Sequence, residues 1–252
     1  MGTIIDLSKH RGQKDALDGP AFIRKAIQDG RLLDVWCFSG GYDGDDEEAP
    51  CNWSGCPLAL GAQWLVMLEI NPDLSQGSLV AIRIQDIAAV QIGSVRDRVV
   101  TRLWQAHGLP RPVVETEVAT DAHSLLARVR EEGGLCAFDV DVEFLPEDHR
   151  LGTVTFDGED DEGNTVTLTT DRADLIEGDD AVLTLIGHVL DVTDDGVFFQ
   201  CLSEGGYWAD HGIWLPLAGL TAITWRDPYV QRLAAGSDAR PEVRPDRRLQ
   251  LV

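Results

Sequence analysis

Cys51 and Cys56 are a first pair of residues whose type and spacing suggest chemistry. Two thiolates five positions apart, in a segment that also contains glycine and proline, can share a zinc ion if Cys37 or a histidine completes the tetrahedron. A structural zinc site usually has a second close pair of ligands, and the sequence contains none. The other interpretation is two ordinary thiols in a loop, or a loop disulfide. We therefore predict no metal and no cofactor, and keep a Cys51 and Cys56 metal site as the alternative.

Asp210 and His211 are the most site-like pair for acid–base catalysis. An aspartate beside a histidine in a loop can orient the imidazole ring, and Cys201 lies nearby in the sequence. The ordinary interpretation is a hairpin loop held by its aromatic neighbours. No serine lies in a nucleophile elbow, and no glycine pair is long enough to hold a phosphate. We favour a non-catalytic protein, and an enzyme or metalloprotein with a site near Asp210, His211 and Cys201 is the alternative.

The formal net charge of −22 restricts the class of partner. Three lysines, Lys9, Lys14 and Lys25, stand among 21 basic residues, so acidic side chains dominate the surface. Such a charge repels phosphate groups and attracts a basic protein. We therefore expect a basic protein partner and no direct binding of nucleic acid. The alternative is that the acidity serves solubility alone.

Acidic loops and loop tryptophans are the candidate residues for binding that partner. Exposed carboxylates give salt-sensitive attraction, and tryptophans in loops are typical anchors of protein interfaces. The same tryptophans could instead cover the open end of a barrel, and the acidic loops could simply be solvated. The predicted partner-binding residues are Asp45, Asp46, Glu47, Glu48, Trp53, Asp160, Asp161 and Trp208.

A repeated spacing of apolar positions predicts a duplicated structural unit. Six apolar positions between residues 80 and 92 recur 133 residues later, and three in a first helix recur 103 residues later. Helices are predicted over 21–28 and 95–105 and after Asp121. Strands are predicted over 32–38, 64–70, 79–84, 87–92, 138–144, 181–192, 197–201, 213–217 and 220–225, with a hairpin around 157–163. The segment 39–61 is too rich in glycine, proline and acidic residues for regular structure.

The segment 187–197, which ends in the turn Asp194-Asp195-Gly196, resembles the bent second and third strands of Sm-like or SH3-like barrels. The apolar residues from Ile213 to Ile223 then resemble the closing strands of those barrels. The resemblance covers roughly a quarter of the chain and implies small, strongly bent sheets. Many Sm-like proteins bind RNA, but the acidic surface argues against that activity here.

These observations predict an α+β, β-rich fold with two duplicated small bent-sheet or barrel (Sm/SH3-like) units, each flanked by helices. The expected organisation is a polar arm at 1–20, a first unit at 21–108, a linker at 109–120, a second and larger unit at 121–235, and a Pro/Arg tail at 236–252. The expected function is that of an acidic protein-binding module. One version of this function is an inhibitor or immunity-type protein that acts on a basic partner. Five cysteines, an odd number, and the lack of a signal or membrane segment predict a cytoplasmic protein with no membrane contact. The oligomeric state stays open.

Overall fold

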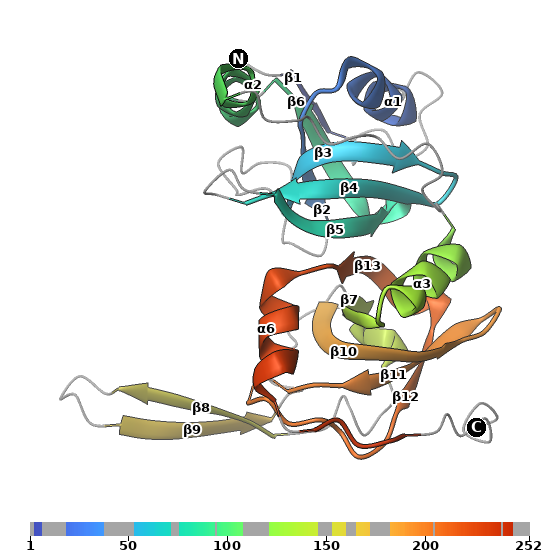
Figure 1. Cartoon of the computed structure of the whole chain (residues 1–252), viewed down its shortest axis with the longest axis vertical. Coiled ribbons are helices and arrows are strands. Elements are labelled where there is room, and N and C mark those ends of the chain that lie inside the picture. The colour runs from blue at the N-terminus through green and yellow to red at the C-terminus, as the bar shows by residue number, and fades with distance from the viewer. Residues whose placement is uncertain are drawn as a thin grey trace.

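The computed structural model describes residues 3–6, 19–37, 53–71, 76–93, 95–107, 121–145, 153–159, 165–171, 182–203, 205–237 and 239–243. These residues form a mixed α+β fold in which one large antiparallel sheet is accompanied by few helices. We call the described residues up to 107 the first half and those from 121 onward the second half. Figure 1 shows the halves stacked along the long axis of the molecule.

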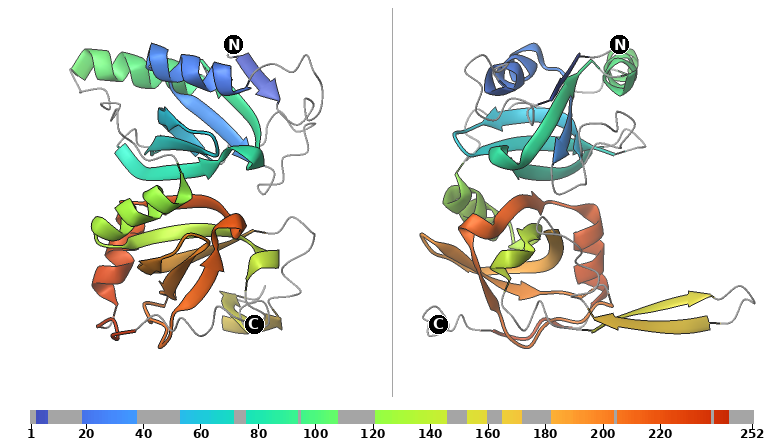
Figure 2. Two further views of the ribbon diagram at one scale, coloured as in Figure 1. Left: turned by 90° about the vertical axis from the view of Figure 1, so that its right-hand side faces the viewer. Right: turned by 180° about the vertical axis from the view of Figure 1, so that it is seen from behind.

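The first half contains two helices and six strands. The helices lie at its outer end (Figures 1 and 2). In chain order its elements are β1 (Thr3–Asp6), α1 (Gly19–Asp29), β2 (Leu33–Cys37), β3 (Trp53–Leu60), β4 (Trp64–Ile70), β5 (Gln76–Arg83), the 3-10 helix η3 (Ile84–Asp86), β6 (Ile87–Ile92) and α2 (Val95–His107).

The second half contains a helix beside the first half, a second helix, and a hairpin that projects away from the body (Figures 1 and 2). Its elements are α3 (Ala122–Glu131), β7 (Leu135–Asp141), the 3-10 helix η4 (Val142–Phe144), β8 (Thr153–Glu159), β9 (Thr165–Asp171), β10 (Val182–Val192), β11 (Gly196–Cys201), β12 (Ile213–Pro216), the 3-10 helix η5 (Leu217–Gly219), β13 (Leu220–Trp225) and α6 (Pro228–Gly236).

One sheet of eleven described strands runs through both halves in the order β1-β6-β2-β3-β4-β5-β13-β7-β10-β11-β12, while β8 and β9 form a separate hairpin. The halves join where β5 pairs with β13, from Leu79 opposite Trp225 to Ile82 opposite Ala222. We call this pairing the seam. The sheet is not closed: β1 and β12 are its end strands among the described residues.

Strand pairing follows the same register in both halves. Leu33 lies opposite Gly55 in the first half and Cys136 opposite Gly187 in the second. A residue of β2 corresponds to the residue 103 positions later in the second half. The difference is 132 positions for β3 and β4 and 133 for β5 and β6. The facing pair Trp64 and Arg83 therefore corresponds to the facing pair Gly196 and Pro216. Register shifts fall at equivalent places too, as in β3 between Pro57 and Ala59 and in β10 between Val189 and Asp191. We call residues related by these offsets equivalent.

Gly55 and Gly187 are equivalent positions that require glycine. A Cβ atom on Gly55 would lie 2.2 Å from the carbonyl oxygen of Leu68, and one on Gly187 would lie 2.1 Å from that of Gln200. Backbone atoms cannot move aside as a flexible side chain can, so no other residue fits without a shift of the strands. Both halves therefore bring two strands together at the same point with the same residue type.

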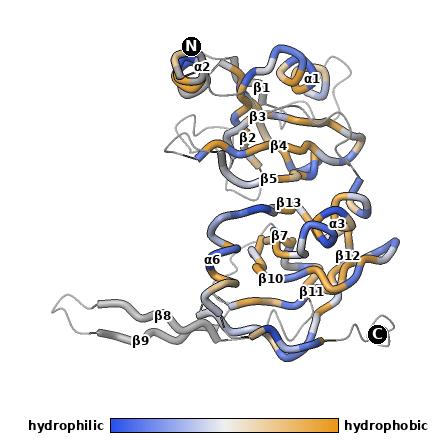
Figure 3. Tube along the Cα trace, in the orientation of Figure 1, coloured by the Kyte–Doolittle hydropathy of each residue, from blue (hydrophilic) through white to orange (hydrophobic). Residues whose placement is uncertain are grey.

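The hydrophobic core consists of two clusters. The first is shared by the halves, with members that include Trp64, Val66 and Ala81 from the first and Phe138, Leu215 and Trp225 from the second. The second cluster holds Ile23 and Ala26 of α1 against the strands of the first half, and Ala222 is its one buried member from the second half. Figure 3 shows the apolar residues concentrated along the strands. The shared cluster means that burial in one half depends on the other.

Local sequence accounts for the helix starts. Asp121 lies before α3, and its carboxylate accepts the N–H of Ser124 at 2.9 Å. Asp227 does the same for α6, where Pro228 occupies the first turn and needs no N–H partner. Asp227 also accepts a hydrogen bond from the Ser78 hydroxyl at 2.6 Å, so this cap ties the two halves together.

The structure confirms the β-rich α+β class and corrects one local prediction. The expectation of irregular structure over 39–61 is wrong for β3, because Cys56 and Leu58 are buried in the shared core and stabilise a strand despite its glycine and proline. The polar arm predicted at 1–20 contains β1 and the start of α1. No described helix combines the length and apolar character that crossing a membrane requires.

Candidate functional site

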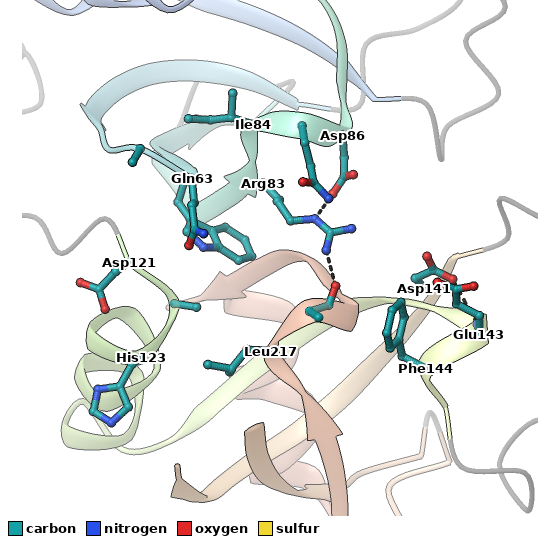
Figure 4. A pocket seen from close by; sticks show the side chains of 15 residues that line it. Gln63, Arg83, Ile84, Asp86, Asp121, His123, Asp141, Glu143, Phe144 and Leu217 are labelled. Carbon is teal, nitrogen blue, oxygen red and sulfur yellow. Dashed lines mark hydrogen bonds and ion pairs between the residues drawn. The ribbon is translucent and has the colours of Figure 1, made fainter. Parts of the chain in front are cut away.

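A cavity of about 1080 Å³ lies between the halves and opens to solvent (Figure 4). The first half contributes the β3–β4 turn and η3, and the second half contributes the start of α3, the end of β7 with η4, and η5. We call this cavity the groove. Its ionisable lining residues are Arg83, Asp86, Asp121, His123, Asp141 and Glu143.

Arg83 crosses the groove from one half to the other. Its Nε donates to the carboxylate of Asp86 and its Nη1 donates to the carbonyl oxygen of Ala218 in η5. The side chains of Arg83 and Asp86 are 15% and 18% exposed, so the pair is shielded from much of the solvent. Figure 4 shows the guanidinium reaching from the first half toward η5. Arg83 is thus occupied by contacts within the chain.

Asp121 and His123 form one end of the groove. The hydrogen bond from the backbone N–H of Ser124 lowers the pKa of the Asp121 carboxyl, and the nearby His123 acts in the same direction. Both residues are exposed. This end therefore presents a carboxylate that stays ionised into the acid range.

Asp141 and Glu143 form the opposite end beside Phe144. The Asp141 carboxylate accepts the backbone N–H of Glu143 at 3.1 Å, which holds the turn into η4. Phe144 packs on Gly219, where a Cβ atom would lie 2.5 Å from that of Phe144. An aromatic ring therefore lies between two acidic residues and the η5 turn.

Asp139 belongs to the same strand face as Asp141, two residues earlier on β7. Burial raises the pKa of its carboxyl, although the Thr184 hydroxyl donates to it at 2.7 Å. Burial, together with the charges of Asp86 and Asp139, also raises the pKa of the Cys37 thiol. Cys37 is therefore protonated at neutral pH, which makes it a poor nucleophile and a poor metal ligand.

Within the described residues, no group of three or more His, Cys, Asp and Glu side chains is arranged to hold a metal ion. Among the described residues, the groove has four carboxylates and one arginine, and that arginine already has two partners within the chain. Its charge and its aromatic and aliphatic walls fit a cationic side chain with an apolar stem. The charge and walls of the groove therefore suit a cation better than an anion.

All six acidic residues predicted to bind a partner lie outside the described residues. These are Asp45, Asp46, Glu47, Glu48, Asp160 and Asp161, and Cys51 of the alternative metal site lies outside as well. Their roles stay predictions.

The two predicted tryptophans are both half-buried. Trp53 begins β3 and packs against the cluster of the first half. Trp208 donates from Nε1 to the Ser237 hydroxyl at 2.9 Å, and the guanidinium carbon of Arg240 lies 5.9 Å from its ring centroid. Trp208 therefore holds the chain after α6 against the β11–β12 connection, a contact compatible with either predicted role.

The alternative catalytic residues lie away from the groove lining. Asp210 and His211 are exposed, and Cys201 is half-buried at the end of β11, where its carbonyl oxygen accepts the N–H of Ala209 at 2.9 Å. Cys56 is buried in the shared core. None of these four residues lines the groove.

The groove residues were missed as a set, although part of the signal was present. The alternation of Asp139, Asp141 and Glu143 with apolar residues predicts a strand with one acidic face, and that face ends in the groove. Arg83 carries no such signal, because its contact with Ala218 depends on the seam. No family model, curated protein or solved structure matches the chain, so the interpretation of the groove depends on its geometry alone.

Proposed function

We propose that this is a non-catalytic binding protein whose groove takes a cationic segment of a basic protein. The observation that carries the proposal is the charge of the groove, where Asp86, Asp121, Asp141 and Glu143 line the same cavity as Arg83, whose guanidinium is held by Asp86 and Ala218. The overall charge of −22 adds long-range attraction for such a partner.

The size and walls of the groove support a peptide segment rather than a single ion. A volume of about 1080 Å³ is at the upper end for a small-molecule site and accommodates several side chains. Phe144, Ile84 and Leu217 offer apolar surface on which the stem of an arginine or lysine can pack while its charge meets a carboxylate. A cationic peptide uses both features, whereas a phosphate-bearing ligand would be repelled.

The equal registers of the two halves support a finer proposal about the fold. Each half is a copy of one small bent-sheet unit of the Sm/SH3-like kind, and the second copy is enlarged by the residues between β7 and β10. The groove then lies between two related units and combines the end of one with the end of the other. Partner binding, an inhibitory role toward a basic enzyme and a cytoplasmic location belong to the same proposal.

The test measures binding of an octa-arginine peptide by calorimetry at low and moderate salt. The variant D141N/E143Q removes two groove charges while keeping the side-chain shapes, and we expect it to weaken binding about 10-fold, which is about 1.4 kcal/mol. The dependence of affinity on salt should flatten in the same variant, because fewer ion pairs are formed.

The matched control is D194N/D210N, which removes two exposed carboxylates outside the groove. It should weaken binding no more than about 2-fold, the effect of net charge alone. Equal losses in the two variants would show that the peptide senses only the overall charge, and the groove would then not be the binding site.

A further inference from the structure

β1 pairs with β6, the strand equivalent to β13. It covers the residues of β6 that are equivalent to the β13 residues paired with β5 at the seam. At the seam, β5 pairs with Ala222, Ile223, Thr224 and Trp225. The equivalent residues of β6, 133 positions earlier, are Ala89, Val90, Gln91 and Ile92, and these are the four residues that pair with β1. Both pairings are antiparallel.

β12 is the strand equivalent to β5, and its outer edge has no strand partner among the described residues. The N–H of Leu217 bonds to Asp195, as the equivalent N–H of Ile84 bonds to Gln63. Strand alternation then directs the backbone N–H and C=O of Trp214 away from β11, as it directs those of Ala81 toward β13. β12 therefore offers the edge that β5 uses at the seam.

We propose that β1 prevents the chain from assembling with itself, by covering the edge of β6 to which β12 of a second copy would otherwise bind. The contact would repeat the seam between two chains, with Trp214 of one copy opposite Val90 of the next and Ile213 opposite Gln91. Because the two surfaces differ, each added copy leaves a new β12 edge and the contact extends head to tail.

The contact between copies is weaker than the seam. Arg83, which bonds to Ala218 across the seam, is equivalent to Pro216 in β12, and proline has no side-chain donor. An attached strand such as β1 acts at an effective concentration of about millimolar, so it excludes a second copy at ordinary protein concentrations. Loss of β1 is therefore the step that permits assembly.

The first experiment compares the intact chain with the full-length variant I4P/I5P, whose prolines remove two N–H groups from β1. Light scattering after size exclusion, from about 10 µM to about 500 µM, should show a molecular mass that rises with concentration beyond that of a dimer. The matched control I4V/I5V keeps the N–H groups and the strand preference of β1, and its mass should stay equal to that of the unaltered chain. A variant that is folded and keeps the mass of the intact chain across this range overturns the proposal.

The second experiment reads the register with cysteines. In Q91C/I213C added to I4P/I5P, oxidation should link position 91 of one copy to position 213 of another, because the equivalent residues Thr224 and Val80 lie directly opposite each other at the seam. Each single-cysteine variant and the out-of-register pair Q91C/A218C control for the native cysteines and for random collision. Assembly without the specific 91–213 link overturns the proposed contact.

Q91C/I213C in the otherwise intact chain keeps the test decisive if the proline variant misfolds. The intermolecular link should then form slowly at high concentration and faster as mild urea releases β1, while the single-cysteine controls stay unlinked. No link above the controls under these conditions overturns the proposal.

Discussion

The two halves have the same pairing register but carry different side chains at equivalent positions. In the first half, Asp34 and Ser54 are buried on facing strands, and the Ser54 hydroxyl donates to the Asp34 carboxylate at 2.6 Å. The equivalent pair in the second half is Ala137 and Ile186. The second half has a half-buried apolar pair where the first half has a buried polar pair, so the strand register does not depend on the polar pair.

A second set of equivalent positions also differs in polarity between the two halves. Cys56 and Leu68 of the first half pack in or against the core shared with the second half. Their equivalents, His188 and Gln200, are polar, and the Gln200 amide donates to the carbonyl oxygens of Ala209 and Pro241. A face that meets another half is apolar, whereas the equivalent face covered by the C-terminal segment is polar.

The largest expected effect tests whether the halves unfold as one unit. Phe138 is fully buried in the shared core, with its ring centroid 4.5 Å from that of Phe199. F138A should lower the free energy of unfolding by about 4 kcal/mol, because it removes a large side chain and leaves a cavity. Hydrogen exchange should show reduced protection in β4 of the first half as well as in β10. Unchanged protection in β4 would mean that the halves unfold independently.

The two close-approach glycines test whether the halves are equivalent in energy as well as register. G55A and G187A should each cost about 3 kcal/mol in urea unfolding, since each new Cβ atom would meet a backbone oxygen at 2.2 or 2.1 Å. G236A is the control, because a Cβ atom added to Gly236 would have no neighbouring atom within 4 Å. A difference of more than about 1 kcal/mol between G55A and G187A would show that one half relaxes where the other cannot.

Replacing the buried polar pair of the first half by the half-buried apolar pair of the second has a smaller effect. D34A should cost about 2 kcal/mol, because it leaves the buried Ser54 hydroxyl without its acceptor. D34A/S54I installs the Ala and Ile of the second half and should recover most of the loss. The measurement is the urea midpoint of both variants. If the double variant is less stable than D34A, the surroundings of the pair differ more than the registers indicate.

The sequence predicts most of the strands that share a pairing register in the two halves, because apolar spacing is a local property of a chain. The offset of 133 residues found in the sequence is the difference in residue number between β5 and β6 and their equivalents in the second half. The offset of 103 residues is the same difference for β2. β3 was missed because Gly55 and Pro57 are usual signs of a loop, whereas here Gly55 permits a close strand crossing.

The groove could be predicted only in part for a related reason. The acidic face of β7 is visible as alternation. Arg83 and Ala218 are 135 residues apart, and their meeting depends on the pairing of β5 with β13 at the seam. No local pattern specifies that pairing. The same limit applies to β1, whose partner β6 follows it by more than 80 residues.

The smallest expected effect concerns pH and the polar face of the second half. Burial, and next the charge of Arg240, lowers the pKa of His188 below its ordinary value of 6.5. The unfolded chain therefore binds a proton more readily than the folded one, and His188 should reduce stability as the pH falls below about 6.5. H188C, which installs the equivalent Cys56 residue, should lose less stability over this range.

Urea unfolding of the unaltered protein and H188C from about pH 7.5 to about pH 5 checks this sign, because their other titrating groups are the same and cancel in the difference. R240Q should fall between them, since it removes the nearby charge but leaves the buried imidazole. If the free energy of unfolding depends on pH in the same way for all three proteins, the folded protein tolerates protonated His188. The polar face would then differ from its first-half equivalent in composition but not in its response to pH.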